Sequence, residues 1–167
     1  MTNDLFLKMK DFYDTSPLAL KLAQPLKEGA VGEIQFEGDP ESYTLIKEGG
    51  RSVLKIGKPK KPEVFMKYSR SAVEYLFELH QQKNYDIQEW MNRFSECILH
   101  PTPERKIEFK VCANLVTVAR MGYFGMLKLG GKRAFDLALE FGVKIPKKFL
   151  ASSAPRVRGA AKAGKNL

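Results

Sequence analysis

The 167-residue sequence predicts an α+β domain in which helices cover a sheet of about five mainly antiparallel strands. Four short runs of alternating apolar and polar residues follow one another between residues 33 and 68. A fifth run, residues 107–111, comes after a long helical interval. Segments with apolar residues at helical spacing lie before, between and after these runs. The chain length suits one domain with a full core.

Two helices are expected before the first strand, within residues 1–28. The first is indicated by apolar residues at helical spacing, namely Leu5, Phe6, Met9, Phe12 and Tyr13. Ser16 followed by Pro17 is typical of a helix N-terminus. We therefore expect a second, short helix through Leu22 that ends at Pro25.

Alternation predicts the first four strands. They cover residues 33–37, 42–47, 51–56 and 64–68. The second and third runs are separated by Gly49 and Gly50, which favour a tight hairpin turn. These four runs favour an antiparallel sheet.

Two sequence patterns with the spacing of a capping box follow the fourth strand. Ser71 with Glu74 is expected to open one helix, and Asp86 with Glu89 a second that ends before Pro101. The apolar residues expected to be buried are Val73, Leu76 and Phe77 in the first helix and Ile87, Trp90, Met91, Phe94 and Ile98 in the second.

The most informative segment is a strand followed directly by an unusually apolar helix, Leu115–Leu129. In the strand, Ile107, Phe109 and Val111 alternate with charged residues. On one continuous helix, the polar residues of 115–129 would share a stripe with Met121 and Phe124. This helix has more apolar surface than is needed to cover one face of a small, half-buried sheet. The extra apolar surface indicates either that a neighbouring element covers this helix or that the helix borders an opening for an apolar molecule.

A last helix is expected over Arg133–Phe141, after a break at Gly130 and Gly131. Its apolar residues again span a wide arc.

The net charge of +9 is distributed unevenly. Residues 144–167 contain seven Lys or Arg and no acidic residue, so residues 1–143 are nearly balanced. We expect one domain over residues 1–143 and a mobile basic tail over 144–167. Four tail residues are candidates for contact with an anionic membrane surface: Lys147, Lys148, Arg156 and Arg158. Solubility is the alternative explanation for the tail.

Composition and motifs exclude several functional classes. No segment is long and apolar enough to cross a bilayer, and the N-terminus lacks a signal-peptide pattern, so we expect a cytoplasmic protein. Cys97 and Cys112 lack paired spacing and are expected to be free thiols. No set of ligands has the usual metal-site spacing, and phosphate-binding glycine motifs are missing. The sequence therefore predicts neither a metal nor a cofactor.

Four segments resemble the sterol carrier protein 2 family of lipid-binding domains. They are Gly32–Phe36, Tyr43–Val53, Glu63–Val73 and Arg105–Val111. The resemblance, which spans about residues 32–129, implies a five-stranded sheet covered by helices on one side. It also implies an elongated hydrophobic cavity that takes sterols, fatty acyl chains or related lipids.

The chain departs from the family pattern in two places. Cys112, Ala113 and Asn114 replace the family's Gly-Asp or Gly-Asn turn, and residues 79–105 are longer than the family linker. The longer segment inserts an extra helix around Trp90 before the last strand. That helix could reshape or plug the cavity.

The favoured hypothesis is a non-enzymatic carrier that binds and transfers a lipid-like ligand in an internal apolar cavity. The expected lining is Ile34, Phe36, Phe65, Phe109, Leu115, Val118, Gly122, Met126, Leu129 and Phe135, with Met121 and Phe124 at the entrance. The alternative is an interaction module whose basic tail binds nucleic acid or an acidic partner, although the balanced charge of residues 1–143 argues against it. A thiol hydrolase built on Cys97 and His100 is disfavoured, because no orienting group or oxyanion loop accompanies them.

Overall fold

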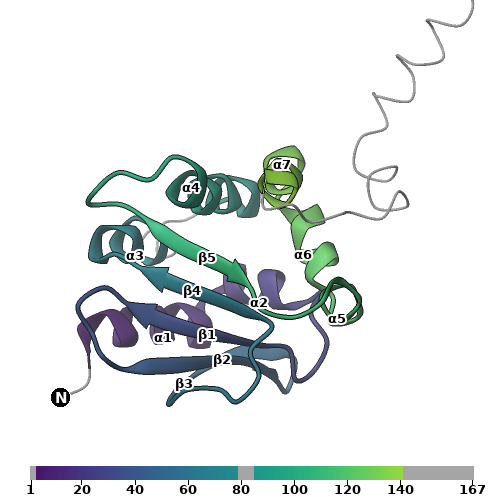
Figure 1. The fold of residues 1–167 in the computed structure, drawn as a ribbon, viewed down its shortest axis with the longest axis horizontal. Helices are drawn as coiled ribbons and strands as arrows, with labels where there is room; N and C mark the ends of the chain where they lie inside the picture. The colour runs from purple at the N-terminus through teal and green to yellow at the C-terminus, as the bar shows by residue number, and fades with distance from the viewer. Residues whose placement is uncertain (1–2, 79–84, 141–167) are drawn as a thin grey trace, which may run out of the picture.

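The computed structural model describes residues 3–78 and 85–140 (Figure 1). The helices are α1 (Asp4–Thr15), α2 (Pro17–Ala23), α3 (Arg70–Phe77), α4 (Ile87–Leu99), α5 (Leu115–Arg120), α6 (Tyr123–Leu129) and α7 (Lys132–Glu140). The strands are β1 (Val31–Phe36), β2 (Ser42–Glu48), β3 (Arg51–Ile56), β4 (Val64–Tyr68) and β5 (Ile107–Val111). The expected domain end at 143 and the basic tail, with its four candidate membrane contacts, lie outside the described residues.

The five strands form one mixed sheet in the order β3-β2-β1-β4-β5. Three of the four pairings are antiparallel, which confirms the predicted α+β class and the mainly antiparallel sheet. The expectation that the first four runs are all antiparallel is wrong, because β4 lies parallel to β1 with Gly32 opposite Val64. The chain leaves β3 beside Ser42, and residues 57–63 return it to the end of the sheet where Glu63 meets Val31. This return sets the direction of β4.

The two faces of the sheet differ in polarity. On one face, Phe36 and Tyr43 pack together with ring centroids 5.3 Å apart, and Phe6 of α1 stacks on Tyr43 at 4.9 Å. On the other face, Ser42 donates a hydrogen bond of 2.8 Å to Glu33. Alternation along each strand thus places the core between the sheet and the helices.

Of the two predicted helix N-caps, the one of α4 is confirmed and the one of α3 is wrong. Asp86 caps α4 and accepts a hydrogen bond from the backbone N–H of Gln88 at 3.1 Å, as predicted. The expectation that Ser71 caps α3 is wrong, because the helix begins earlier, at Arg70, and its cap is Ser69. Ser69 accepts hydrogen bonds from the N–H groups of Ala72 at 3.3 Å and Lys106 at 3.0 Å. It therefore joins the start of α3 to the start of β5.

We expect Ser69→Ala to lower the free energy of unfolding by about 1–2 kcal/mol, because two backbone N–H groups lose their acceptor. Ser71→Ala, a half-buried position inside α3, is expected to change it by less than about 0.5 kcal/mol. Urea unfolding of the two variants measures the difference. Equal losses would contradict the assignment of Ser69 as the cap.

The predicted single helix over 115–129 is in fact two helices. Gly122 adopts φ +91° between α5 and α6, and the backbone N–H of Lys27 donates to the carbonyl of Met121 at 2.9 Å. The backbone of Pro25 occupies the space where a Gly122 side chain would lie. The chain turns here because the α2–β1 connection packs against it. The expected stripe along one helix therefore does not exist as a single face.

The break before the last helix is confirmed. Gly131 has φ +68°, and α7 begins at Lys132. Phe141, the expected end of this helix, lies outside the described residues.

Candidate functional site

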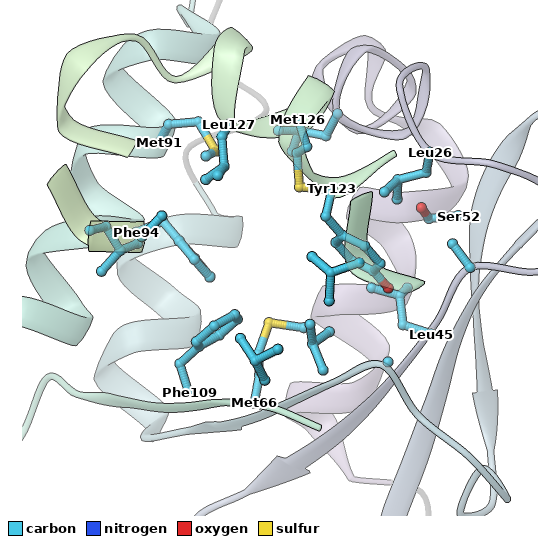
Figure 2. A pocket seen from close by; sticks show the side chains of 18 of the residues that line it. Leu26, Leu45, Ser52, Met66, Met91, Phe94, Phe109, Tyr123, Met126 and Leu127 are labelled. Carbon is cyan, nitrogen blue, oxygen red and sulfur yellow. The ribbon is translucent and has the colours of Figure 1, made fainter. Parts of the chain in front are cut away.

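A pocket of about 160 Å³ lies between the sheet and helices α4, α6 and α7 (Figure 2). Strand residues on its wall include Leu45, Val64, Met66, Phe109 and Val111. Helical residues on its wall include Trp90, Met91, Phe94, Val118, Met126, Leu127 and Leu137. Almost every described residue on the wall is apolar, so the pocket suits a molecule that avoids water.

The register of β4 and β5 builds the sheet side of the pocket. Met66 lies opposite Phe109, and Val64 lies opposite Val111. Because side chains alternate along a strand, all four face the helices. In Figure 2, Met66 and Phe109 lie across the open space from Met91 and Leu127.

The inserted helix α4 forms a wall of the pocket. Trp90, Met91 and Phe94 all line it. Trp90 is held by a 3.0 Å hydrogen bond from its indole N–H to the carbonyl of Leu76 and stacks on Phe94 at 5.5 Å. The helix around Trp90 does not plug this pocket, because its side chains form a wall beside the open space.

Several residues on the pocket wall are partly exposed, among them residues of β5, an edge strand of the sheet. Val111 is 39% exposed, and Phe94, Phe109 and Met126 are half-buried, although all four line the pocket. A bound molecule could therefore extend past these residues.

The volume limits how much of a ligand the pocket encloses. An apolar cavity of about 150 Å³ holds a benzene ring, whereas pockets for drug-sized molecules measure about 300–1,000 Å³. At about 160 Å³, this pocket encloses one ring or a short alkyl segment.

Lys47 is a charged residue on the pocket wall. It is 8% exposed, and its ammonium donates to the carbonyls of Ala23 at 2.7 Å, Leu26 at 2.8 Å and Gln24 at 3.4 Å. These carbonyls lie at and just beyond the C-terminal end of α2, where a cation is favoured. All three ammonium hydrogens therefore have backbone acceptors. Strand alternation could have identified Lys47 in the sequence, because residues 43, 45 and 47 lie on the same face of β2 and Tyr43 and Leu45 are apolar.

Three tyrosines lie on the pocket wall: Tyr13, Tyr68 and Tyr123. Burial raises the pKa of all three phenols well above the usual value, so they are neutral at physiological pH. The Tyr123 hydroxyl lies 3.5 Å from the carbonyl of Val31, and that of Tyr68 donates to the Met66 sulfur at 3.3 Å. Sequence analysis missed these tyrosines, because apolar spacing cannot separate a pocket residue from a core residue.

Four residues that the sequence singles out as lining or entrance residues lie on the pocket wall. They are Phe109, Val118, Met126 and Phe124. Phe124, expected at the entrance, is only 1% exposed and lies inside, because the break at Gly122 rotates α6 relative to α5.

The remaining candidates are not among the described residues that line the pocket. Ile34 and Phe36 are fully buried in the core. Phe65 points to the opposite face of the sheet, where the Lys110 ammonium lies 5.5 Å from its ring centroid. Leu115 is 40% exposed, and Phe135 is buried in a cluster with Val118. The others, Met121, Gly122 and Leu129, are partly buried on or beside the α5–α6 turn and α6.

Cys97 and His100 lie beside a second, polar hollow of about 260 Å³. Cys97 is 1% exposed, and burial raises the pKa of its thiol to about 11. The thiol is therefore protonated at neutral pH and a poor nucleophile. His100 is exposed at the C-terminal end of α4. Glu96, on the same hollow, is paired with Arg133 at 3.1 Å.

Within residues 3–78 and 85–140, no group of three His, Cys, Asp or Glu side chains is placed to hold a metal ion. No helix in these ranges has the length and apolar character needed to cross a bilayer.

Comparisons with known proteins give one structural likeness to report. No family model matches the sequence, and no curated protein matches it. A solved structure titled "UbiJ-SCP2 Ubiquinone synthesis protein" aligns with 75% of this chain and 92% of its own, at 12% sequence identity and a TM-score of 0.44.

Proposed function

We propose that this protein is a non-enzymatic carrier that binds a lipid-like apolar molecule in the pocket between its sheet and helices α4, α6 and α7. The observation that carries the proposal is an almost wholly apolar pocket of about 160 Å³ between the sheet and these helices. The protonated Cys97 thiol supports a role without covalent chemistry. The free thiols of Cys97 and Cys112 fit a reducing compartment such as the cytoplasm.

The pocket wall is almost wholly apolar, so binding is expected to come mainly from apolar surface removed from water, at about 25 cal/mol per Å². Such binding selects for size and apolarity more than for detailed shape.

Methionine methyl groups offer a direct test on the full chain. Met66, Met91 and Met126 line the pocket, whereas Met9 is fully buried in α1 and does not. In protein labelled with ¹³C at the methionine methyls, titration with α-methylstyrene, a small planar hydrocarbon, is expected to shift the three pocket signals. The Met9 signal serves as an internal control and is expected to stay in place.

A matched pair of variants distinguishes pocket filling from surface binding. Met126→Trp places a large side chain at the pocket rim and is expected to weaken hydrocarbon binding at least about tenfold. Leu139→Trp adds the same side chain at a position on α7 that is 52% exposed, and is expected to leave binding unchanged. Native mass spectrometry of protein purified from cells is expected to show a co-purified apolar molecule. The absence of methyl shifts together with a homogeneous ligand-free mass would refute the proposal.

A further inference from the structure

An exposed apolar patch lies where β5 ends and α5 begins (Figure 1). Val111 is 39% exposed, Leu115 40% and Val116 74%, and we call these three residues the α5 patch. Within the described residues seven large hydrophobic side chains are exposed, and three of them fall in this one short segment. Exposed apolar side chains that cluster, unlike those scattered singly, mark an interaction surface.

The backbone fixes which side of α5 faces solvent. The carbonyl of Glu63 accepts hydrogen bonds from the N–H groups of Cys112 at 2.8 Å and Ala113 at 3.2 Å, which anchors the segment before the helix. Val118, two residues after Val116, is 6% exposed and lines the pocket. Residues two apart in a helix point to nearly opposite sides. The helix therefore turns Val118 inward and Val116 outward.

The segment around the α5 patch carries positive charge only. Residues 109–135 contain five Lys or Arg and no Asp or Glu. Arg120 is exposed and lies one helical turn after Val116, on the same side of α5. Its guanidinium forms no ion pair with a described residue, so its charge is available to a partner.

Two further lysines come close to this segment from other parts of the chain. Lys27 is exposed, and its backbone N–H donates to the carbonyl of Met121 at 2.9 Å, at the end of α5. Lys61 is exposed and precedes Glu63 by two residues. The acidic neighbour of Lys27, Glu28, accepts hydrogen bonds from backbone N–H groups of the β2–β3 turn at 2.8 and 3.0 Å. Its carboxylate is therefore already occupied.

An apolar centre with a basic border fits the surface of an anionic bilayer. Apolar side chains can enter the boundary between headgroups and acyl chains, while Lys and Arg attract acidic headgroups. Nucleic acid would pair with the cations but leave Val116 without an apolar partner. A second copy of this chain would cover Val116 but bring like charges together.

We propose that the α5 patch docks this protein on the surface of an anionic lipid bilayer, with Leu115 and Val116 in the headgroup region and Arg120 beside acidic headgroups. Val111 and Val118 also line the pocket, so the docked bilayer would lie beside the pocket wall. This inference goes beyond the proposed function and does not depend on it, because membrane binding is measured without a ligand in the pocket.

Vesicle sedimentation with the full chain tests the docking. One set of vesicles contains phosphatidylcholine mixed with phosphatidylglycerol, and the other contains phosphatidylcholine alone. The protein is expected to bind the mixed vesicles at least about tenfold more tightly, because neutral lipid offers nothing to the basic border. Added salt is expected to weaken this binding, since exposed charges are screened.

A matched pair of variants locates the apolar contact. Val116→Asp is expected to weaken binding to the mixed vesicles at least about tenfold, because a carboxylate replaces the most exposed apolar side chain of the patch. An acidic residue in the first turn of a helix is favoured, so α5 is expected to form in this variant. Ile56→Asp makes the same kind of change at a residue that is 67% exposed on β3, the opposite edge strand, and is expected to leave binding unchanged.

A second pair locates the basic contact. Arg120→Gln is expected to weaken binding to the mixed vesicles about fivefold, the effect of one basic residue near an anionic surface. Lys55→Gln removes one positive charge from β3 and is expected to leave binding unchanged.

The outcomes separate this inference from the proposed function. No binding of the unmodified protein to mixed vesicles, equal binding to both vesicle types, or equal losses in Val116→Asp and Ile56→Asp would overturn the docking surface. Undiminished binding of Val116→Asp would also overturn it, because a contact made by residues 144–167 does not need Val116. The methionine-methyl titration of Val116→Asp with α-methylstyrene is expected to match that of the unmodified protein, since Val116 is not among the residues that line the pocket.

Discussion

Replacing Gly122 with alanine is expected to lower the free energy of unfolding by more than about 4 kcal/mol, enough to unfold many domains of this size. An alanine Cβ would lie 2.0 Å from the carbonyl oxygen of Pro25 and 2.9 Å from its carbonyl carbon. Both are backbone atoms of the α2–β1 connection, so neither can rotate away. The residue also has φ +91°, a conformation unfavourable for alanine.

Gly38→Ala provides the matched control for Gly122→Ala. Gly38 has φ +83°, nearly the same backbone conformation, but no atom lies within 4 Å of the position that an alanine Cβ would take there. The Gly38 variant is expected to lose only about 1 kcal/mol, the cost of the backbone conformation alone. Urea unfolding followed by circular dichroism measures both variants. Similar losses would show that the close approach of Pro25 is not what requires glycine at 122.

Replacing Lys47 with methionine is expected to cost about 3 kcal/mol of stability. Methionine retains an apolar stem of similar length but removes the donors to the carbonyls of Ala23, Gln24 and Leu26. Hydrogen bonds from a charged group contribute about 1.5–3 kcal/mol each, and acceptors left unpaired in a buried place add to the loss. The end of α2 and the connection toward β1 are then expected to loosen first, which hydrogen exchange would detect.

Lys55→Met is the matched control on the neighbouring strand. Lys55 forms a 2.7 Å ion pair with Glu48, and both side chains are 47% exposed. An exposed pair of this kind contributes less than about 1 kcal/mol. If thermal or urea unfolding gave equal losses for the two variants, Lys47 would act as an ordinary surface charge.

Local sequence features were sufficient for most of the secondary structure. The turn at Gly49 and Gly50 is confirmed by positive φ angles of 62° and 84°, and the hairpin pairs Leu45 with Leu54. Asp86 caps α4 as its spacing predicts. These features depend on residues close together in the chain, so their physical causes can be recognised in the sequence itself.

The errors arise where a distant segment decides the local conformation. Apolar spacing predicts one helix over 115–129, but the α2–β1 connection packs against Gly122 and breaks it. Ser71 has capping-box spacing, yet Ser69 is the cap and also accepts the N–H of Lys106, 37 residues further along the chain. The parallel pairing of β4 with β1 likewise depends on the path of the connection after β3.

The sequence alone determined the α+β class, the five strands and the apolar surplus of the segment after β5, because alternation, helical spacing and caps act over a few residues. It also placed Phe109, Val118 and Met126 among the pocket candidates. The tertiary structure decided which apolar residues meet around open space and which pack solidly, and it brought Tyr13, Lys47 and Tyr68 to the pocket wall. The physical reason is that burial against a partner or against a void depends on contacts between segments far apart in the chain, which periodicity does not encode.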